Sequence, residues 1–298
     1  MGIIDELKEI THVDARYDEQ MKKHTGYGVG GKAKIFVRVD SLYTLNLVLT
    51  LIKKHKEKFR VIGNGSNILF SDNDYDGVII SLLPLNEVFF KRDKVKAMAG
   101  AKLEKLINFT YENNLTGLEA LSGIPATIGG AVCMNAGAFG KNISDHIETV
   151  ETLVDGKIKV YDKNECDFSY RRSRFLHKNQ AIVSATFSFM EGDKLEIKER
   201  IKTYLDLRKN LLPTGKSCGS VFKNPKNVSA GRLIDLALLK GYSIGGAKIS
   251  EKHGNFIITE SGAKAQDVYA LIKDVKSKIK DKYNIELNEE IEYIGEFN

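Results

Sequence analysis

The stretch SGIPATIGGAVCMNAGAFG, residues 122–140, contains five glycines and no charged side chain, although 28% of the whole chain is charged. A membrane-spanning helix needs about 20 predominantly apolar residues. Ser122, Pro125 and Asn135 interrupt this stretch, and its many glycines disfavour a helix. Glycine permits positive φ and close approach of the backbone to a bulky group. The stretch therefore predicts either a backbone surface that receives a large, flat ligand or a tight, buried crossover between strands.

The length of 298 residues indicates two domains or one large domain, and a hydrophobic fraction of 42% is enough for a core. The formal net charge is +6, with the lysines spread along the chain. The densest basic cluster, KKHKEK at 53–58, contains a glutamate and follows an apolar-periodic segment, which is typical of a solvated helix end. A mildly basic surface favours an anionic small molecule. We therefore expect a small-molecule substrate and no nucleic-acid partner.

Cys133, Cys166 and Cys218 are far apart and odd in number, which argues against a disulfide framework and for a reducing compartment. The first residues, MGIIDELKEI, are acidic and amphipathic and lack the order of a signal peptide. The six histidines never occur at metal-ligand spacing. We expect a cytoplasmic protein with no membrane insertion and no metal.

Hydrophobic periodicity predicts strands and helices mixed without strict alternation, which indicates an α+β fold in two lobes. Expected strands lie at 35–39, 59–63, 78–82, 88–100 with a turn at Arg92-Asp93, 150–160 with a turn at Asp155-Gly156, 181–190, 243–249, 255–259 and 287–295. Expected helices lie at 3–10, from Leu42 after a Ser41 cap, at 103–110, at 195–212, from a Ser229 cap through Leu239, and from Ser261. The sequence becomes richer in charged residues near Lys194, where the long predicted helix begins.

Two glycine motifs approach nucleotide-binding signatures but fail at the residues that carry the chemistry. GYGVGGKA at 26–33 nearly matches a P-loop, yet Ala33 cannot supply the hydroxyl for Mg²⁺. GNGSNI at 63–68 begins like a dinucleotide fingerprint, yet Ile68 stands where the third glycine belongs. The turn at 63–67 can form an anion-binding nest. An ordinary Asn-Gly hairpin turn is the alternative.

Three glycine-rich loops, at 24–32, 63–67 and 122–140, each adjoin strand-like segments. A long ligand with a central pyrophosphate and a ring at each end would use several such loops, and FAD has that shape. The uncharged stretch would then offer its backbone to the pyrophosphate and the isoalloxazine ring. The combination favours an FAD site.

Seven motifs occur in order across positions 63–295. They are GNGSNILFSD (63–72), GLEALSGIPATIGGAVCMNAGAFG (117–140), FSYRRSRF (168–175), GSVFKNP (219–225), AGRLID (230–235), ISEKHGNFII (249–258) and LNEEIEYIG (287–295). Together they resemble the UDP-N-acetylenolpyruvoylglucosamine reductase family. The chain length is similar to that of the shorter subclass of this family, which lacks a substrate-covering insertion.

The resemblance implies a two-part FAD-binding lobe of the vanillyl-alcohol-oxidase type over residues 1–195, with its core at about 24–192. It implies a C-terminal α+β substrate-binding domain over residues 196–298, noncovalent FAD, and NADPH as co-substrate. The implied reaction reduces UDP-N-acetylglucosamine enolpyruvate to UDP-N-acetylmuramate in peptidoglycan precursor biosynthesis. Such a reaction needs a cation beside the substrate carboxylate and a proton source at the adjacent carbon. We also expect a monomer.

The resemblance assigns three catalytic residues: Arg171 at the carboxylate, Ser220 as proton donor, and Glu290 to assist the proton or orient the carboxylate. The substrate contacts that it suggests are Tyr170, Lys223, Asn224 and His253. The cofactor-binding residues that it suggests are Gly63, Asn64, Gly65, Ser66, Asn67, Ile68, Gly123, Ile124, Pro125, Thr127, Gly129, Gly130, Asn135, Ala136 and Gly137.

The residues alone leave these assignments open. Arg172 and Arg174 are as plausible as Arg171, and strand alternation places Glu289 and Glu290 on opposite faces without selecting either. For the substrate contacts, a surface role is an equal alternative.

One sequence departure from the family also bears on the site. Ala126 replaces a glycine that is usual in the family, and its methyl group fits if φ is negative.

Two alternative functions fit parts of the sequence. An oxidase of the same flavin fold would act on a sugar or lactone with O₂, and the joint presence of Arg171, Ser220 and Glu290 argues against it. A basic nucleotide- or RNA-binding protein would carry a basic stripe with interleaved aromatic residues. The sequence has no such stripe.

Overall fold

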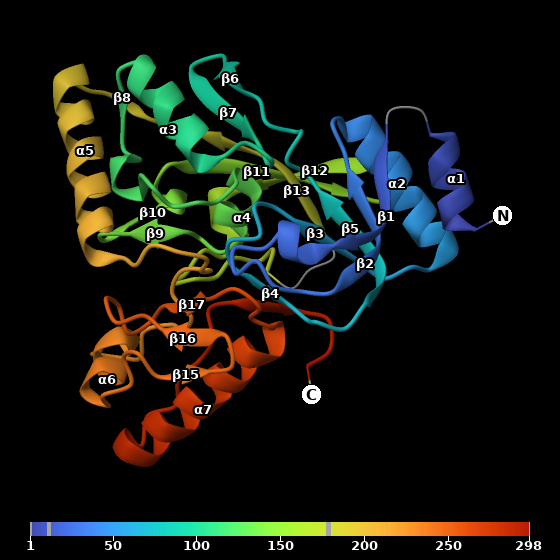
Figure 1. Cartoon of the computed structure of the whole chain (residues 1–298). Helices are drawn as coiled ribbons and strands as arrows, with labels where there is room; N and C mark the ends of the chain where they lie inside the picture. The colour runs from blue at the N-terminus through green and yellow to red at the C-terminus, as the bar shows by residue number, and fades with distance from the viewer. Residues whose placement is uncertain (1, 11–12, 177–179, 298) are drawn as a thin grey trace. The chain divides into compact units, whose positions relative to one another are not determined.

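A computed structural model describes residues 2–10, 13–176 and 180–297 (Figure 1). The chain divides into two compact units. The first comprises the chain up to Tyr17, Ile35–Asn64 and Gly77–Arg208, and the second comprises Asp18–Lys34, Gly65–Asp76 and the chain from Lys209 onward. Helices and strands mix along the chain, which confirms the α+β class.

The N-terminal part of the chain forms a four-stranded sheet of order β1-β2-β5-β3. Its strands are β1 Asp14–Gln20, β2 Lys32–Arg38, β3 Phe59–Ile62 and β5 Tyr75–Ser81, and the two helices of this part are α1 Ile3–Glu9 and α2 Leu42–His55. Helix α2 begins as predicted after Ser41, whose Oγ accepts a hydrogen bond from the N–H of Thr44 at 3.0 Å. Strands β3 and β5 are parallel.

A five-stranded antiparallel sheet belongs to the first unit. Its order is β12-β11-β13-β7-β6, with β6 Val88–Lys91, β7 Lys94–Met98, β11 Ile147–Val154, β12 Lys157–Asp162 and β13 Ala181–Phe187. Every residue of the central strand β13 is buried. The turns predicted at Arg92-Asp93 and Asp155-Gly156 are confirmed, because β6 pairs with β7 and β11 pairs with β12. Asp155 and Gly156 both have positive φ, as a tight two-residue hairpin turn requires.

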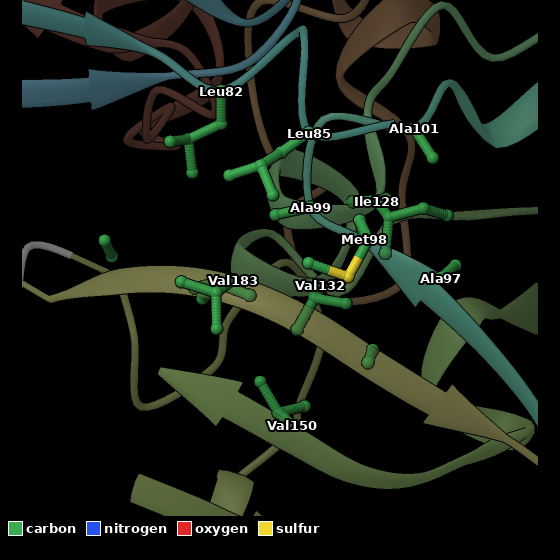
Figure 2. Close-up of a cluster of buried hydrophobic side chains, with 14 of the residues drawn as sticks. Leu82, Leu85, Ala97, Met98, Ala99, Ala101, Ile128, Val132, Val150 and Val183 are labelled. Carbon is green, nitrogen blue, oxygen red and sulfur yellow. The ribbon is translucent and has the colours of Figure 1, made fainter. Parts of the chain in front are cut away.

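Helices α3 Leu103–Glu112 and α4 Ile128–Cys133, and α5 Lys194–Leu211 as far as Arg208, complete the first unit. Figure 2 shows part of its core, where Ile128 and Val132 of α4 lie beside Met98 and Val183 of the sheet. Packing of this kind holds α4 against β7 and β13. The shorter elements of the chain are β8 Leu115–Thr116, β9 Gly137–Ala138, β10 Lys141–Asn142, β14 Met190–Glu191 and the 3₁₀ turns Met21–Lys23, Glu119–Leu121, Ile143–Asp145 and Lys163–Cys166.

The second unit contains a three-stranded sheet and a parallel strand pair. The sheet consists of β15 Ser243–Ile244, β16 Ala247–Ile249 and β17 Ile257–Thr259, and the pair consists of β4 Ile68–Phe70 and β18 Glu292–Ile294. Its helices are α6 Ala230–Leu236 and α7 Ala265–Tyr283. As predicted, α7 buries one face, which includes Val268, Ile272, Val275 and Ile279.

Three predicted element ends in the second unit are wrong. Helix α7 does not open at Ser261, because its first N–H groups, those of Ala265 and Gln266, donate to the carboxylate of Asp72 at 2.9 Å each. Helix α6 ends at Leu236 rather than Leu239, and Leu238 has a left-handed φ of 60° that a helix cannot continue through. The last strand spans only β18, since the residues before it pair with other segments.

We expected the change of lobe after residue 195. The contacts place the change of unit after Arg208, and they assign residues 18–34 and 65–76 to the second unit. Helix α5 starts in the first unit because its side chains contact that unit: Arg200 Nη2 lies 3.2 Å from Glu119 Oε1, and the rings of Tyr204 and Phe139 lie 5.0 Å apart.

Candidate active site

The glycine-rich stretch at 122–140 contains the short helix α4, which the sequence analysis did not predict. Thr127 precedes it, and its Oγ1 accepts a hydrogen bond from the N–H of Gly130 at 3.4 Å. The helix buries Ile128, Ala131 and Val132. Their i, i+3, i+4 spacing after a threonine is a helix signal that the adjacent glycines obscured. Part of the stretch is therefore a crossover packed on the core, one of the two possibilities that the sequence left open.

The turn at Gly63-Asn64 lies against the same stretch. Asn64 Nδ2 donates to the carbonyl oxygen of Pro125 at 2.9 Å. A Cβ on Gly63 would overlap Thr127 Oγ1, so only glycine fits there. Ala126 does not adopt a positive φ, so its methyl group is tolerated as expected. Two of the three glycine-rich loops thus meet within the first unit.

The other half of this turn belongs to the second unit, where Gly65 lies against the loop at 24–32. The N–H of Gly26 donates to the carbonyl oxygen of Gly65 at 2.9 Å. Gly65 has a φ of 66°, and a Cβ there would overlap the carbonyl oxygen of His24. Ser66 and Asn67 lead from this turn into β4, whose first residue is Ile68.

Two buried polar atoms of the 122–140 stretch, Ser122 Oγ and Asn135 Oδ1, have no hydrogen-bond partner among the described residues. Because buried polar atoms normally have a partner, a bound molecule with N–H or O–H donors fits this place. FAD offers both kinds of donor. The N–H groups of Ile128 and Gly129 already donate to the carbonyls of Ala101 and Ala99 at 2.8 Å, so these two amides are not available to a phosphate.

The predicted cofactor-binding residues are thus divided between the units. Gly63, Asn64, Gly123, Ile124, Pro125, Thr127, Gly129, Gly130, Asn135, Ala136 and Gly137 belong to the first unit, and Gly65, Ser66, Asn67 and Ile68 belong to the second.

Arg171 occupies a tight turn of the first unit, closed by hydrogen bonds between the main chains of Ser169 and Arg172. Its φ is 53°, a left-handed conformation that costs a non-glycine residue about 1–2 kcal/mol. Arg171 Nη2 donates to the carbonyl of Gly137 at 2.9 Å, and the guanidinium lies 5.4 Å from the centre of the Tyr170 ring. Strained backbone of this kind clusters at functional sites.

The same turn is attached to the glycine-rich stretch by two further hydrogen bonds. Asn135 Nδ2 donates to the carbonyl of Ser169 at 2.9 Å, and Ser173 Oγ donates to the carbonyl of Cys133 at 2.7 Å. Arg174 points elsewhere, since its Nη1 donates to the carbonyl of Glu165 at 2.7 Å. Arg172 is exposed. These contacts favour Arg171 among the three arginines.

Ser220 and Glu290 are 70 positions apart in the sequence and are brought together in the second unit. The segment from Ser220 to Lys223 runs between two others: Ser220 pairs with Phe256 on one side, and Phe222 pairs with Glu289 on the other. The N–H of Glu290 donates to the carbonyl of Val221 at 2.7 Å. Glu290 also receives a hydrogen bond at its own carbonyl from Asn67 Nδ2 at 3.0 Å.

Glu289 and Glu290 differ in their surroundings. Both carboxylate oxygens of Glu289 lie 2.8 Å from Lys276 Nζ of α7, so this carboxylate is already neutralised by a lysine. Glu290 is fixed through its main chain to Val221 and Asn67. The ion pair with Lys276 gives Glu289 a structural role at α7.

The four predicted substrate contacts have different local roles. Tyr170 is exposed beside Arg171. The main-chain N–H of Lys223 donates to the carbonyl of Asn288 at 2.8 Å. Asn224 Oδ1 accepts from the N–H of Ala230 at 3.0 Å, so it supports the start of α6.

His253 is the fourth predicted contact. Burial, with a smaller contribution from Lys240, lowers its pKa. Its Nδ1 accepts from the N–H of Asn255 at 3.2 Å, so the proton of the neutral ring is on Nε2.

Cys218 lies two residues before Ser220 and is only 3% exposed. Its Sγ donates to the carbonyl of Ile68 at 3.3 Å, and burial raises the pKa of the thiol to about 12. Such a thiol is unreactive. It supports the β4 segment, a role that the sequence did not indicate.

Within residues 2–10, 13–176 and 180–297, no group of three or more His, Cys, Asp or Glu side chains could hold a metal ion. In the same part of the chain, no helix combines the length and the apolar character that crossing a bilayer requires.

A family model described as an FAD binding domain matches residues 33–160. The chain is thus an FAD-dependent flavoprotein, with a glycine-lined surface that fits the cofactor. A second model, described as UDP-N-acetylenolpyruvoylglucosamine reductase, C-terminal domain, matches residues 211–294 and contains Ser220 and Glu290.

Similarity to known proteins extends over nearly the whole chain. The UDP-N-acetylenolpyruvoylglucosamine reductase of Caldanaerobacter subterraneus subsp. tengcongensis is 39% identical over 99% of this chain and 98% of its own. The enzyme of the same name from Bacillus subtilis is 39% identical over 98% of each. The crystal structure of the Thermus caldophilus reductase matches with a TM-score of 0.81 at 35% identity, covering 95% of this chain and 98% of that one. The chain belongs to the UDP-N-acetylenolpyruvoylglucosamine reductase family.

Proposed function

We propose that this protein reduces UDP-N-acetylglucosamine enolpyruvate to UDP-N-acetylmuramate with NADPH, a step in making peptidoglycan precursors. Its relatives are named as reductases of this enolpyruvyl sugar nucleotide. The observation that carries the proposal is the pairing of Glu290 with Val221 beside Ser220, in a chain that also has an FAD-binding domain. A proton donor with a neighbouring carboxylate is what protonation of the substrate requires.

In this proposal, bound FAD supplies the hydride that the vinyl carbon receives. The Ser220 hydroxyl gives its proton to the adjacent carbon, and the Glu290 carboxylate supports that transfer. The Arg171 guanidinium binds the substrate carboxylate, because a planar, permanently charged fork suits two oxygens that gain negative charge. Its contacts to Gly137 and Tyr170 keep this fork in one orientation.

Further assignments rest on the same family resemblance. We propose that residues 196–298 supply the substrate-binding part, with Lys223, Asn224 and His253 as polar contacts and Tyr170 beside the carboxylate. We further propose a monomeric, cytoplasmic enzyme that takes no nucleic-acid partner. The wide spacing and odd number of its cysteines and its dispersed lysines support this assignment.

The rival is an oxidase of the same flavin fold. It would react with O₂ and would not need the Ser220–Val221–Glu290 arrangement. An anaerobic visible spectrum of the purified holoprotein separates the two functions. We expect NADPH to bleach the flavin absorbance and the enolpyruvyl sugar nucleotide, but not a sugar or lactone, to restore it. Rapid reoxidation by air, with no response to the sugar nucleotide, would instead identify an oxidase.

A further inference from the structure

Asn255 is the residue that holds the Ser220 segment from the side opposite to Glu290. It is 4% exposed. Its Oδ1 accepts from the N–H of Phe222 at 2.9 Å, and its Nδ2 donates to the carbonyl of the same residue at 2.8 Å. One carboxamide thus satisfies both main-chain groups of Phe222, two positions after Ser220.

The Asn255 carboxamide extends the pairing between the Ser220 segment and the Phe256 segment by one residue, beyond the point where main-chain pairing ends. Ser220 pairs with Phe256, and the N–H of Val221 donates to the carbonyl of Asn255 at 2.9 Å. The chain then turns, because the N–H of Phe256 donates to the carbonyl of His253 at 3.0 Å. No peptide group of this turn therefore pairs with Phe222, and the Asn255 side chain binds its N–H and carbonyl instead. A carboxamide carries the same donor and acceptor as a peptide unit.

The opposite edge of the segment carries Glu290. The carbonyl of Val221 accepts from Glu290, and the N–H of Lys223 donates to the carbonyl of Asn288 at 2.8 Å. The peptides on both sides of Val221 are therefore fixed between Asn255 and the chain around Glu290. A shift of the Phe222 peptide moves Ser220 and the Glu290 hydrogen bond together.

We propose that Asn255 is a positioning residue for the proton-transfer half of the reaction, and that it sets Ser220 in register with Glu290. This assignment rests on the proposed function. Asn255 touches neither substrate nor cofactor in this scheme; it acts through the main chain of Phe222. Its removal affects substrate reduction and spares the reduction of the flavin by NADPH.

Asn255→Asp tests this, because the change keeps the shape and removes one donor. An ionised aspartate accepts from Phe222 but faces its carbonyl with a second acceptor, so the pairing opens. A protonated aspartic acid has one donor and one acceptor and restores it. A buried carboxyl that faces a carbonyl is protonated more readily than an exposed one. The defect of the variant therefore shrinks as the pH falls.

The measurement is stopped-flow absorbance of the holoenzyme, with flavin reduction by NADPH and reoxidation by the enolpyruvyl sugar nucleotide recorded separately from pH 6 to 8.5. For Asn255→Asp we expect the rate of flavin reduction by NADPH to stay within about twofold of wild type. At high pH the rate of flavin reoxidation by the sugar nucleotide should fall roughly 10²-fold, the usual effect of displacing a catalytic group by about 1 Å. The difference in reoxidation rate between Asn255→Asp and wild type becomes smaller toward pH 6. His253 lies against residue 255, and a carboxylate there would raise the pKa of its ring. Asn255→Ser adds no charge, so its pH profile shows how much of the pH dependence comes from His253 alone.

Two further variants, Asn255→Ser and Asn73→Asp, test the interpretation of the Asn255→Asp result. Asn255→Ser loses the bidentate pairing without gaining a titratable group, so it shows the same selective deficit at every pH. It also replaces Asn255→Asp if that variant does not fold. Asn73→Asp is the matched control, because Asn73 is exposed and its side chain donates to the carbonyl of Glu296 at 3.3 Å.

Equal loss of both half-reactions, or wild-type reoxidation in Asn255→Asp and Asn255→Ser at pH 8.5, overturns the assignment. Failure of the proposed function gives a different result, because the wild-type enzyme itself would then not be reoxidised by the sugar nucleotide.

Discussion

The N–H of Glu290 donates to the carbonyl of Val221 at 2.7 Å, one residue beyond Ser220. This main-chain contact joins two residues that only tertiary structure brings together. Backbone pairing therefore helps to set the positions of Ser220 and Glu290, the residues that we propose as proton donor and supporting carboxylate. Precise placement matters because proton transfer is efficient only within hydrogen-bond reach.

Ser220→Ala should separate the two half-reactions. The flavin is reduced by NADPH at nearly the wild-type rate, whereas reduction of the enolpyruvyl substrate falls about 10²–10⁴-fold, the usual contribution of a general acid. Rapid-mixing absorbance with each substrate alone measures this. Ser261→Ala is the control, because Ser261 is an exposed serine of the same unit. If both steps fell equally, Ser220 would be a folding or binding residue.

Arg171→Lys should impair turnover although the charge is kept, because an ammonium cannot reproduce the planar fork. The substitution keeps a side chain at the left-handed φ of 53°, so the backbone cost is unchanged. We expect kcat for the sugar nucleotide to fall at least about tenfold. Arg172→Lys changes an exposed neighbour and should have no effect. A reversal of these two results would transfer the role to Arg172.

Glu289→Gln and Glu290→Gln should have different effects. The first weakens the ion pair with Lys276, which at this partly exposed site contributes about 0.2–1 kcal/mol of stability, and leaves turnover intact. The second removes the carboxylate that we propose supports proton transfer from Ser220, and it slows substrate reduction. Chemical denaturation and steady-state kinetics of both variants measure the two effects. Loss of turnover in Glu289→Gln alone would contradict the choice of Glu290.

Thiol reactivity should reflect burial. Cys166 and Cys218 are buried, and burial raises the pKa of each thiol to about 12, whereas Cys133 is partly exposed. A disulfide reagent at pH 8 should modify one thiol in the native protein and all three in denaturant. Because Cys133 belongs to the glycine-rich stretch, removal of FAD should speed its modification. Rapid modification of Cys133→Ser would show that a buried thiol is accessible.

Stability should fall in acid partly through His253. Its pKa is lowered in the folded state, so below the unfolded value near 6.5 the unfolded chain binds more protons, and folding loses free energy as the pH falls. The stabilisation is complete above that value. Urea denaturation of wild type and His253→Gln at pH 7.5 and 5.5 isolates this contribution. We expect wild type to lose more free energy, by at most about 1.4 kcal/mol per pH unit. Equal losses would mean that His253 titrates normally.

Local signals in the sequence predicted local structure well. The Ser41 cap and the turns at Arg92-Asp93 and Asp155-Gly156 depend on residues within a few positions of one another, and all three are confirmed. The α+β class followed from hydrophobic periodicity, and the reductase family followed from the order of the seven motifs.

Features that depend on distant partners were not predictable in this way. Asp72 caps a helix that begins at Ala265, although the two residues are 193 positions apart in the sequence. The Asn255 carboxamide lies in a recognised motif, but its partner Phe222 is 33 positions away. Helix α4 was missed for a different reason, because two glycines hid its apolar spacing.

The discontinuity of the second unit has a consequence for protein synthesis. Strand β4 pairs with β18, and Asp72 caps α7. During translation, β4 and Asp72 therefore leave the ribosome long before their partners in the C-terminal part of the chain are synthesised. Contacts between such distant positions slow folding. While the ribosome makes the intervening residues, the β4 edge is open to pairing with other chains. A nascent chain that stalls before Glu292 leaves that edge without its native partner, and we expect such chains to depend on chaperones more than the finished protein does.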